Sequence, residues 1–466
     1  MNIIYIHTHD TGRLIKPYGY NVPTPNLMGF AKDALLFRNA FCGGPTCSPS
    51  RASFLTGRYP HSNGMLGLSH RGFDIKNKGW HMASFFKDNG YETVLCGIQH
   101  ENRFWIPLQR GDVAAKELGY TKHITADMSN CKDDGDLVKW DLLNAENVVN
   151  YLKQASERKE KFFLSYGLFA THREYPELSE DELKYDDLNP NYIHTPKNTY
   201  NDEKSRLDMA RFYKSAKIAD KCFGKVIDVL KETGLYDETV IIFTTDHGIA
   251  NPFMKCNLTD DGIGISLIIR NPKEPNSHGM VVDSMISQID VYPTLCDILN
   301  LDKPDFLQGK SFIDLFKANK KEVNEYIYAE TNFHTSYEPA RCIRTKRYKY
   351  IRYYDNSWNK YNLSNCDESP SKIHLIKHGW REKMKAREYL FDLYFDPAER
   401  NNLANEPEYK DILIELRTEL QNWQERTNDP LLEGHINIHS TWKVNKKECI
   451  LPSSKNPDDY ENLPDY

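Results

Sequence analysis

The segment of residues 47–58 has the spacing of a reactive anion site, and it reads C-S-P-S-R-A-S-F-L-T-G-R. A thiol at Cys47 precedes the guanidinium of Arg51 by one helical turn, so the two side chains should face the same side of a helix. Ser48, Ser50 and Ser53 can supply oxygens for the first turn of that helix. This places Cys47 at or just before a helix N-terminus, where backbone N–H groups favour an anion.

Histidines and aspartates come directly after four predicted strands. The strands are short, buried apolar runs at Ile3–Ile6, Glu92–Cys96, Phe162–Leu168 and Val240–Thr245. The polar residues that follow them, in the same order, are His9 with Asp10, His100, His172, and Asp246 with His247. Ligands of open parallel sheets gather at the carboxyl ends of the strands. We therefore expect these side chains to share one site.

Helical patterns separate these strands and predict the fold class. They lie at Asn26–Asp33, Lys78–Asn89, Leu137–Ser156 and Glu203–Lys231, and a fifth strand is expected at Ser266–Ile269. Alternation of strands and helices of this kind predicts an α/β fold with a largely parallel sheet.

The pattern changes after about Leu301. Short strands without intervening helices are expected at Glu325–Thr331, Arg341–Thr345, Tyr348–Tyr353 and Tyr389–Leu393. Apolar residues at helical spacing in Tyr409–Trp423 then predict one amphipathic helix. We expect a catalytic domain at 1–320, an antiparallel α+β subdomain at 321–439, and an extended or partly disordered polar tail at 440–466.

Composition excludes several function classes. The chain has 466 residues, 39% of them hydrophobic, and a formal net charge of −6, so no basic excess favours nucleic acid or an anionic membrane. No apolar run approaches the roughly 18 residues of a membrane span. The sequence starts on a strand pattern without a signal peptide, and the ten cysteines form no C-x-x-C pair. We expect a cytoplasmic protein with reduced thiols.

Residues 47–58 resemble the signature of the sulfatases, which belong to the alkaline phosphatase superfamily. In that family a dedicated maturation enzyme oxidises the cysteine to formylglycine. The flanks Phe37–Phe41 and Asn63–Leu68 resemble the N-sulfoglucosamine sulfohydrolase (heparan N-sulfatase) branch most closely. The resemblance implies an alkaline-phosphatase-like fold, with a large, mixed, mostly parallel sheet flanked by helices and a smaller C-terminal antiparallel-sheet subdomain. It also implies hydrolysis of a sulfate ester or sulfamate, on a sulfated small molecule or a glycosaminoglycan-type oligosaccharide.

The resemblance assigns roles to the residues of the predicted site. Cys47, as a formylglycine hydrate, would be the nucleophile, and Arg51 would hold that hydrate in its ionised form. His100 would contact the formylglycine. His172 would bind sulfate and protonate the leaving group, and Lys255 would clamp sulfate oxygens.

One divalent metal is implied by the same resemblance. Its ligands would be Asp10, Asp246, His247 and the hydrate of Cys47, with His9 where the family normally has an aspartate. Calcium is expected from the family and prefers oxygen ligands. Two imidazoles would shift the preference toward manganese, zinc or iron. Alternatively, His9 contacts the substrate or the hydrate instead of the metal.

Ile98 is a second departure from the family pattern. It stands where a lysine normally contacts the formylglycine, so Arg103, His9 or Gln99 would have to compensate, and we expect His9 and His100 to share the missing charge. Two other functions stay open. A phosphonate or phosphodiester hydrolase of the same superfamily would share the Asp-His pair, and Ile98 with His9 would suit an inactive sulfated-glycan-binding protein. The loops 101–135 and 172–205 would set specificity, and the oligomeric state is left open.

Overall fold

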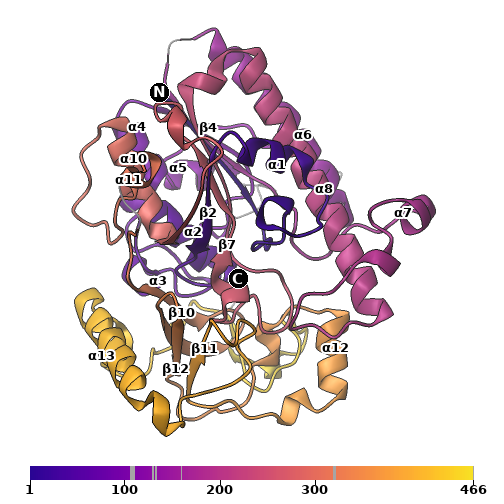
Figure 1. The fold of residues 1–466 in the computed structure, drawn as a ribbon, viewed down its shortest axis with the longest axis vertical. Coiled ribbons are helices and arrows are strands. Elements are labelled where there is room, and N and C mark those ends of the chain that lie inside the picture. The colour runs from indigo at the N-terminus through magenta and orange to yellow at the C-terminus, as the bar shows by residue number, and fades with distance from the viewer. Residues whose placement is uncertain (105–110, 129–130, 132–133, 159, 319–321, 465–466) are drawn as a thin grey trace.

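A large sheet with helices on both faces forms the upper part of the molecule, and a smaller sheet from the C-terminal third lies below it (Figure 1). The computed structural model describes residues 1–104, 111–128, 131, 134–158, 160–318 and 322–464.

The large sheet is mixed and mostly parallel. Within the described residues its order is β4 (Lys122–His123), β3 (Glu92–Gly97), β5 (Phe162–Gly167), β1 (Asn2–Thr8), β6 (Thr239–Thr245), β8 (Leu267–Arg270), β2 (Leu35–Phe41) and β7 (Gly264–Ile265), with β9 (Val281–Ser287) also paired to β2. The first five strands are mutually parallel, and β8 runs antiparallel to β6. Strands β1 and β6 are buried throughout, as expected for strands covered on both faces. The predicted fold class is confirmed.

Two groups of helices cover the two faces of this sheet. One group is α1 (Pro25–Ala31), α6 (Asp134–Ser156) and α8 (Glu203–Glu232); the other is α2 (Cys47–Thr56), α4 (Met82–Asp88), α5 (Gly111–Glu117) and α10 (Val291–Leu299). Four short helices lie in the connections: α3 (Pro60–Asn63), α7 (Glu180–Tyr185), α9 (Asp260–Ile263) and α11 (Ile313–Phe316).

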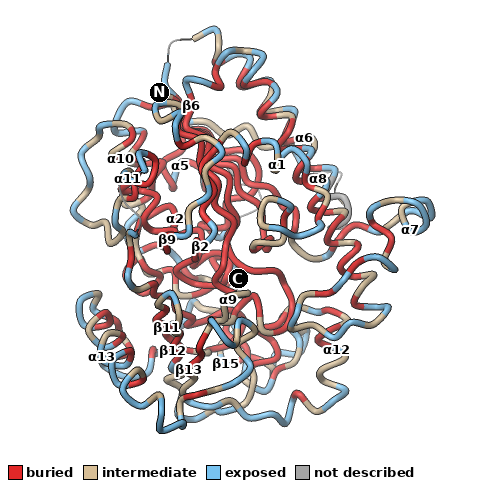
Figure 2. The backbone as a smooth tube through the Cα atoms, viewed as in Figure 1, coloured by how far each residue is buried: buried red, intermediate tan, exposed pale blue. Residues whose placement is uncertain are grey.

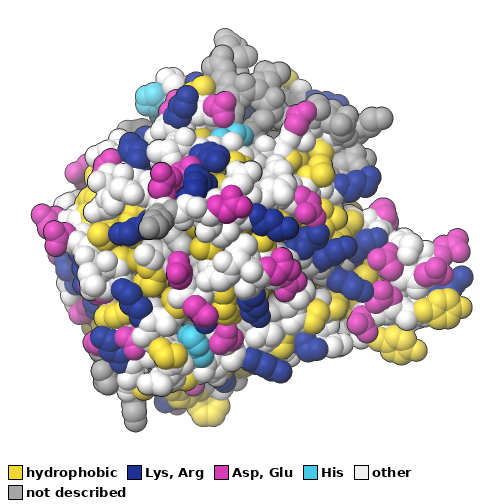
Figure 3. All heavy atoms as spheres, turned by 90° about the horizontal axis from the view of Figure 1, so that it is seen from above, with side chains coloured by type: hydrophobic (Ala, Val, Ile, Leu, Met, Phe, Trp, Pro, Cys, Tyr) yellow, Lys and Arg dark blue, Asp and Glu magenta, His cyan; other side chains and the backbone are white. Residues whose placement is uncertain are grey.

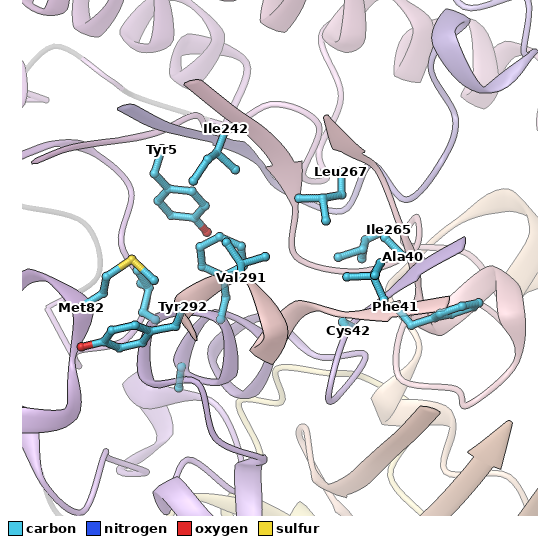
Figure 4. Packing of buried hydrophobic residues seen from close by; sticks show 14 of the residues in the cluster. Tyr5, Ala40, Phe41, Cys42, Met82, Ile242, Ile265, Leu267, Val291 and Tyr292 are labelled. Carbon is cyan, nitrogen blue, oxygen red and sulfur yellow. The ribbon is translucent and has the colours of Figure 1, made fainter. Parts of the chain in front are cut away.

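The core forms a separate layer on each face of the sheet, and the buried strands run through the centre of the molecule (Figure 2). Because side chains alternate along a strand, Ile4 of β1 packs with the first group of helices and Tyr5 with the second. Figure 4 shows this second layer, where Tyr5 and Ile242 from the sheet pack in the same cluster as Met82 and Tyr292.

Strands β2 and β9 were not among the predicted elements. Arg38 and Asn39 interrupt the apolar run of β2, and β9 starts with exposed residues before it enters the core. Both strands lie in the part of the sheet where β2 runs antiparallel to its neighbours β8 and β7. Their sequences therefore lack the continuous apolar run by which the central strands were recognised.

The smaller sheet is antiparallel, in the order β10 (Ile327–Phe333), β11 (Tyr337–Arg344), β12 (Tyr348–Tyr353) and β13 (Glu388–Asp392). Helix α13 (Lys410–Thr427) packs on it through the residues Leu413, Leu416, Leu420 and Trp423. The predicted antiparallel sheet with one amphipathic helix is confirmed. Helix α12 (Pro370–Lys377) lies in the connection between β12 and β13.

The last part of the chain includes the short strands β14 (Val444–Asn445) and β15 (Tyr460–Asn462), which pair with each other. Arg71, which follows α2 and α3 in the sequence, donates hydrogen bonds to the Lys443 and Pro452 carbonyls and to Asn445 Oδ1. The division of the chain at 320 and 440 stays a prediction, and residues 319–321 lie outside the described part.

Acidic and basic side chains are interspersed on the face of the molecule that Figure 3 shows. Among the helices that the structure describes, none combines the length and the apolar character needed to cross a membrane.

Candidate active site

Four neighbouring strands of the large sheet end at one site. Strands β3, β5, β1 and β6 are adjacent in that order. The residues that follow them are His100, His172, His9 with Asp10, and Asp246 with His247. As predicted, these side chains lie together at the carboxyl ends of the strands.

Cys47 enters this site from the first turn of α2. Its Sγ lies 3.4 Å from His247 Nε2 and 3.9 Å from Asp10 Oδ1. The helix starts at the predicted place, but the serines do not cap it: Thr46 is the N-cap and makes no side-chain cap bond. Instead, Ser50 Oγ donates to the Asp246 carbonyl, which fixes α2 against the end of β6.

Burial raises the pKa of the Cys47 thiol well above its usual value, and the positive charge of Lys255 only partly opposes this. The side chain is 2% exposed. An unmodified Cys47 would therefore carry a protonated thiol at neutral pH, and a thiol is a poor nucleophile compared with its thiolate.

Two carboxylates form the centre of the site. Asp246 Oδ1 accepts hydrogen bonds from the backbone N–H groups of Asp10 (2.8 Å) and His247 (2.9 Å). His9 Nδ1 lies between the two carboxylates, 2.9 Å from Asp10 Oδ1 and 3.2 Å from Asp246 Oδ2. His247 Nε2 lies 3.3 Å from Asp10 Oδ1. Asp10 has a φ of 56°, an uncommon conformation that turns the chain at the end of β1.

Two buried cations balance these carboxylates. Arg51 approaches Asp246 Oδ2 through Nε (3.2 Å) and Nη2 (3.1 Å), and Lys255 Nζ lies 2.8 Å from Asp10 Oδ2. Burial acts to raise the pKa of Asp10, but the charge of Lys255 and the neighbouring imidazoles outweigh it. Burial also acts to raise the pKa of Asp246, and this is outweighed by His247, His9 and Arg51. The pKa values of both carboxyls therefore lie below their usual range.

The donor set fits a divalent metal. Ligand atoms of Asp10, Cys47, Asp246 and His247 all lie within 4.8 Å of one another, and these residues are buried. His9 Nε2 is also buried and has no hydrogen-bond partner among the described residues. Two carboxylates are few for calcium, which prefers six or more oxygen ligands, whereas a set of mixed oxygen and nitrogen donors suits manganese or zinc.

His172 lies at the open side of the site. Its side chain is 24% exposed, and its Nε2 is 4.0 Å from Asp10 Oδ2. The Nδ1 atom contacts the Arg173 carbonyl, so Nε2 is the nitrogen that faces the site. The ring packs edge-on against that of His9, with centroids 4.6 Å apart.

His100 is held by another histidine. Its ring stacks on that of His70, with His100 Nε2 3.0 Å from His70 Nδ1, and it lies 5.9 Å from the His9 ring. Burial lowers the pKa values of His9 and His100 well below the usual range. Burial therefore disfavours a positive charge on these two imidazoles, and the expectation that they replace the charge of a lysine at position 98 stays a prediction.

Ile98 packs in an apolar part of the core beside the site. It is fully buried in an apolar cluster with Met128, Leu137, Trp140 and Phe169. The reason is Gly97, whose φ of 78° breaks the alternation of the strand, and whose missing Cβ leaves room for the Gly167 carbonyl.

The other suggested substitutes for the lysine also lie elsewhere. Gln99 hydrogen-bonds the backbone of Phe104 and Glu101. Arg103 is exposed and contacts the Phe104 ring. The cations next to Cys47 are therefore Arg51 and Lys255.

Sequence reasoning missed three residues around the predicted set. His7 accepts a hydrogen bond from Arg51 Nη1, and its position near the end of β1, two residues before His9, was an available signal. Asp367 Oδ2 lies 3.0 Å from Lys255 Nζ. It comes from the connection between β12 and β13, where no sequence pattern marks it. His70 lies in the segment that follows α3.

Family models and curated proteins match most of the chain. The sulfatase family model matches residues 1–301, and a second model, the C-terminal region of N-sulphoglucosamine sulphohydrolase, matches residues 247–387. An ulvan-active sulfatase of Formosa agariphila is 30% identical over 434 residues, which is 90% of this chain and 78% of the relative. The human N-sulphoglucosamine sulphohydrolase is 26% identical, with 88% of this chain and 86% of that protein covered.

Solved structures share the fold. A putative sulfatase from Bacteroides thetaiotaomicron has a TM-score of 0.69 at 21% identity, with 94% of each chain covered. The phosphonate monoester hydrolase of Agrobacterium radiobacter has a TM-score of 0.68 at 18% identity, with 93% of this chain and 97% of that chain covered.

Proposed function

The chain belongs to the sulfatase family and is a sulfuric ester hydrolase, and from this premise we propose that it removes sulfate from a sulfated sugar by way of a formylglycine hydrate at position 47. The observation that carries the proposal is the position of Cys47. Its Sγ faces the two carboxylates, and the guanidinium of Arg51 and the ammonium of Lys255 neutralise those carboxylates from the two sides.

The modification explains why a cysteine with a raised pKa stands at this position. A thiol that attacked sulfur would leave a thiosulfate that is hard to release, whereas one hydroxyl of a geminal diol can attack sulfur and the other can lose its proton to expel sulfate. Residues 47–58 carry the pattern that the maturation enzyme of the family acts on.

The surrounding residues each have a separate role in the reaction. Arg51 stabilises the ionised diol, because its guanidinium keeps its proton under these conditions. Lys255 holds sulfate oxygens and offsets the charge that develops on them. His100 orients the diol. His172, whose Nε2 faces the open side of the site, protonates the departing oxygen of the sugar.

A divalent metal would be held by Asp10, Asp246 and His247, with His9 as a further nitrogen donor. Such a metal would supply positive charge that polarises a sulfate oxygen and favours the ionised form of the diol. Calcium is the expectation from the family, whereas the mixed oxygen and nitrogen donors present suit manganese or zinc better.

The substrate class rests on the relatives. The names of the two relatives are ulvan-active sulfatase and N-sulphoglucosamine sulphohydrolase, and the matched C-terminal model is that of the second. We infer a sulfated glycan as substrate, with the sulfate on an oxygen or on a sugar nitrogen.

Phosphonate monoester hydrolysis is a second candidate. The fold of the Agrobacterium radiobacter phosphonate monoester hydrolase covers 93% of this chain, and Asp246-His247 is the pair that a hydrolase of this kind would share.

A substrate panel with matured protein tests the proposal. Co-expression with a maturation enzyme should make the peptide that contains Cys47 lighter by the difference between CH₂SH and CHO. The modified enzyme should release sulfate from O- or N-sulfated sugars much faster than it cleaves matched phosphate and phosphonate monoesters. Cys47→Ala should abolish turnover. Full activity in that variant, or faster cleavage of phosphonates, would overturn the assignment.

A further inference from the structure

A buried carboxylate in helix α6 fixes the turn that carries His172. Asp141 Oδ1 accepts a hydrogen bond from the Phe169 N–H (2.8 Å), and Oδ2 accepts one from the Ala170 N–H (2.9 Å). The residue is fully buried. Both oxygens of one side chain are therefore used to satisfy two consecutive amides directly after strand β5.

The same turn is fastened on its other side to the end of β1. The His9 N–H donates to the Ala170 carbonyl (3.0 Å), and the Thr171 N–H donates to the His9 carbonyl (2.8 Å). The His172 N–H closes the turn on the Phe169 carbonyl (2.9 Å). The backbone before His172 is thus clamped between α6 and the strand end that also presents Asp10.

Beyond His172 the chain is anchored as well. Arg173 makes two hydrogen bonds to the carboxylate of Asp208, of 2.7 and 2.6 Å. The His172 side chain is partly exposed, its Nδ1 contacts the carbonyl of the next residue, and its ring packs against the rings of His9 and Phe169. The position of its Nε2 therefore depends on the backbone of this turn, which also carries Phe169.

A buried carboxylate such as that of Asp141 carries a desolvation cost when it is ionised. Burial raises its pKa to about 7, and the two backbone hydrogen bonds only partly oppose this. Among the described residues no cation contacts it. A neutral residue would remove the penalty of a buried charge, so the carboxylate is better explained by what it does for the turn than by what it adds to stability.

We propose that Asp141 is a positioning residue that places His172 for proton transfer to the leaving group. The inference rests on the proposed function, in which His172 is the general acid. Asparagine at position 141 would turn its NH₂ group toward one of the two amides, and the resulting shift of the turn would displace His172 Nε2. A displacement of about 1 Å at such a group can reduce the rate by about 10²-fold.

The dependence of the rate on the leaving group tests the role. A sugar sulfate leaves as a basic alkoxide and needs the proton, whereas 4-nitrophenyl sulfate leaves as a stable phenolate. Asp141→Asn should reduce kcat on the sugar sulfate by about tenfold or more and kcat on 4-nitrophenyl sulfate by less than about threefold. In a His172→Ala background, Asp141→Asn should have no further effect, because the two changes would remove one function.

Asp220 provides a matched control. Its carboxylate on α8 also accepts hydrogen bonds from two consecutive amides, those of Asn26 (3.0 Å) and Leu27 (2.8 Å), and its pKa is likewise raised by burial. Asp220→Asn should affect both substrates equally. Amide hydrogen exchange gives a readout without catalysis: Asp141→Asn should speed exchange at Phe169 and Ala170, and Asp220→Asn should not.

The outcomes separate the role of Asp141 from the proposed function. Equal losses on both substrates, additive losses with His172→Ala, or unchanged exchange at Phe169 and Ala170 would overturn the role of Asp141. A wild-type enzyme that hydrolyses neither sulfate would overturn the proposed function instead, and the exchange measurement would then still decide whether Asp141 fixes the turn.

Discussion

Replacing Asp246 by alanine removes the main partner of a buried cation and a proposed metal ligand in one step. Arg51 is 1% exposed, and after the substitution its remaining hydrogen-bond partners among the described residues would be His7 Nδ1 and, at a longer distance, the Thr8 carbonyl. Removing one partner of a buried ion pair typically costs about 3–5 kcal/mol. In the absence of metal, the free energy of unfolding of Asp246→Ala should therefore lie below that of the wild type by about this amount.

Metal binding adds a second and separable effect. At a free metal concentration of about 100 times Kd, the wild type should be stabilised by about 2.7 kcal/mol, and a chelator should remove this stabilisation. Asp246→Ala should lose the metal site, so its stability should not respond to the chelator. Denaturant unfolding of both proteins, with and without the chelator, measures both effects.

Asp10→Ala is the informative control. Lys255 would keep Asp367 as a partner at 3.0 Å, so the metal-free Asp10→Ala protein should lose less stability than metal-free Asp246→Ala. A chelator effect in Asp246→Ala as large as in the wild type would refute the ligand assignment. Equal losses in the two metal-free variants would refute the argument from counter-charges.

Three further outcomes follow from other residues. Ile98→Lys should lower the denaturation midpoint strongly and should not raise kcat, since the side chain would be buried in an apolar cluster, whereas Ile98→Met should be tolerated in both measurements. Burial raises the pKa of Glu101 from 4.5 to about 8, so between these pH values the folded state keeps a proton that the unfolded chain has lost. The free energy of unfolding should therefore decrease as the pH rises from about 4.5 to about 8. Glu101→Gln should remove that slope in thermal unfolding curves recorded across this range. Lys255→Ala should reduce kcat/KM on a sulfated sugar by about 10²-fold, as loss of one charge-stabilising donor does, and a loss below about threefold would remove Lys255 from the site.

The sequence was sufficient where one physical rule acted over a whole element. The central strands β1 and β6 are apolar on both faces, so they were visible as continuous runs, and the residues after them had to lie at the same edge of the sheet. The start of α2 was predicted from the pattern around Cys47.

Other contacts depend on geometry that no local pattern encodes. Ile98 was placed in the site because it stands where the family has a lysine, but its side chain packs in the apolar core after the positive φ of Gly97. Asp141 sits in the middle of a long helix and meets its partners 28 and 29 residues later, and Asp367 reaches Lys255 from the connection between β12 and β13. Such pairings become visible only once the chain is folded.

Helix α2 is unusual in that all ten of its residues are buried. Most helices of a globular protein keep one face toward solvent, whereas this one is enclosed, with Cys47 at its head. An enzyme that must grip the peptide around Cys47 has no access to it in the native state. Any processing of Cys47 by another protein therefore has to be complete before α2 is enclosed during folding. A molecule that folds with an unprocessed Cys47 would have to unfold before the other protein could reach it.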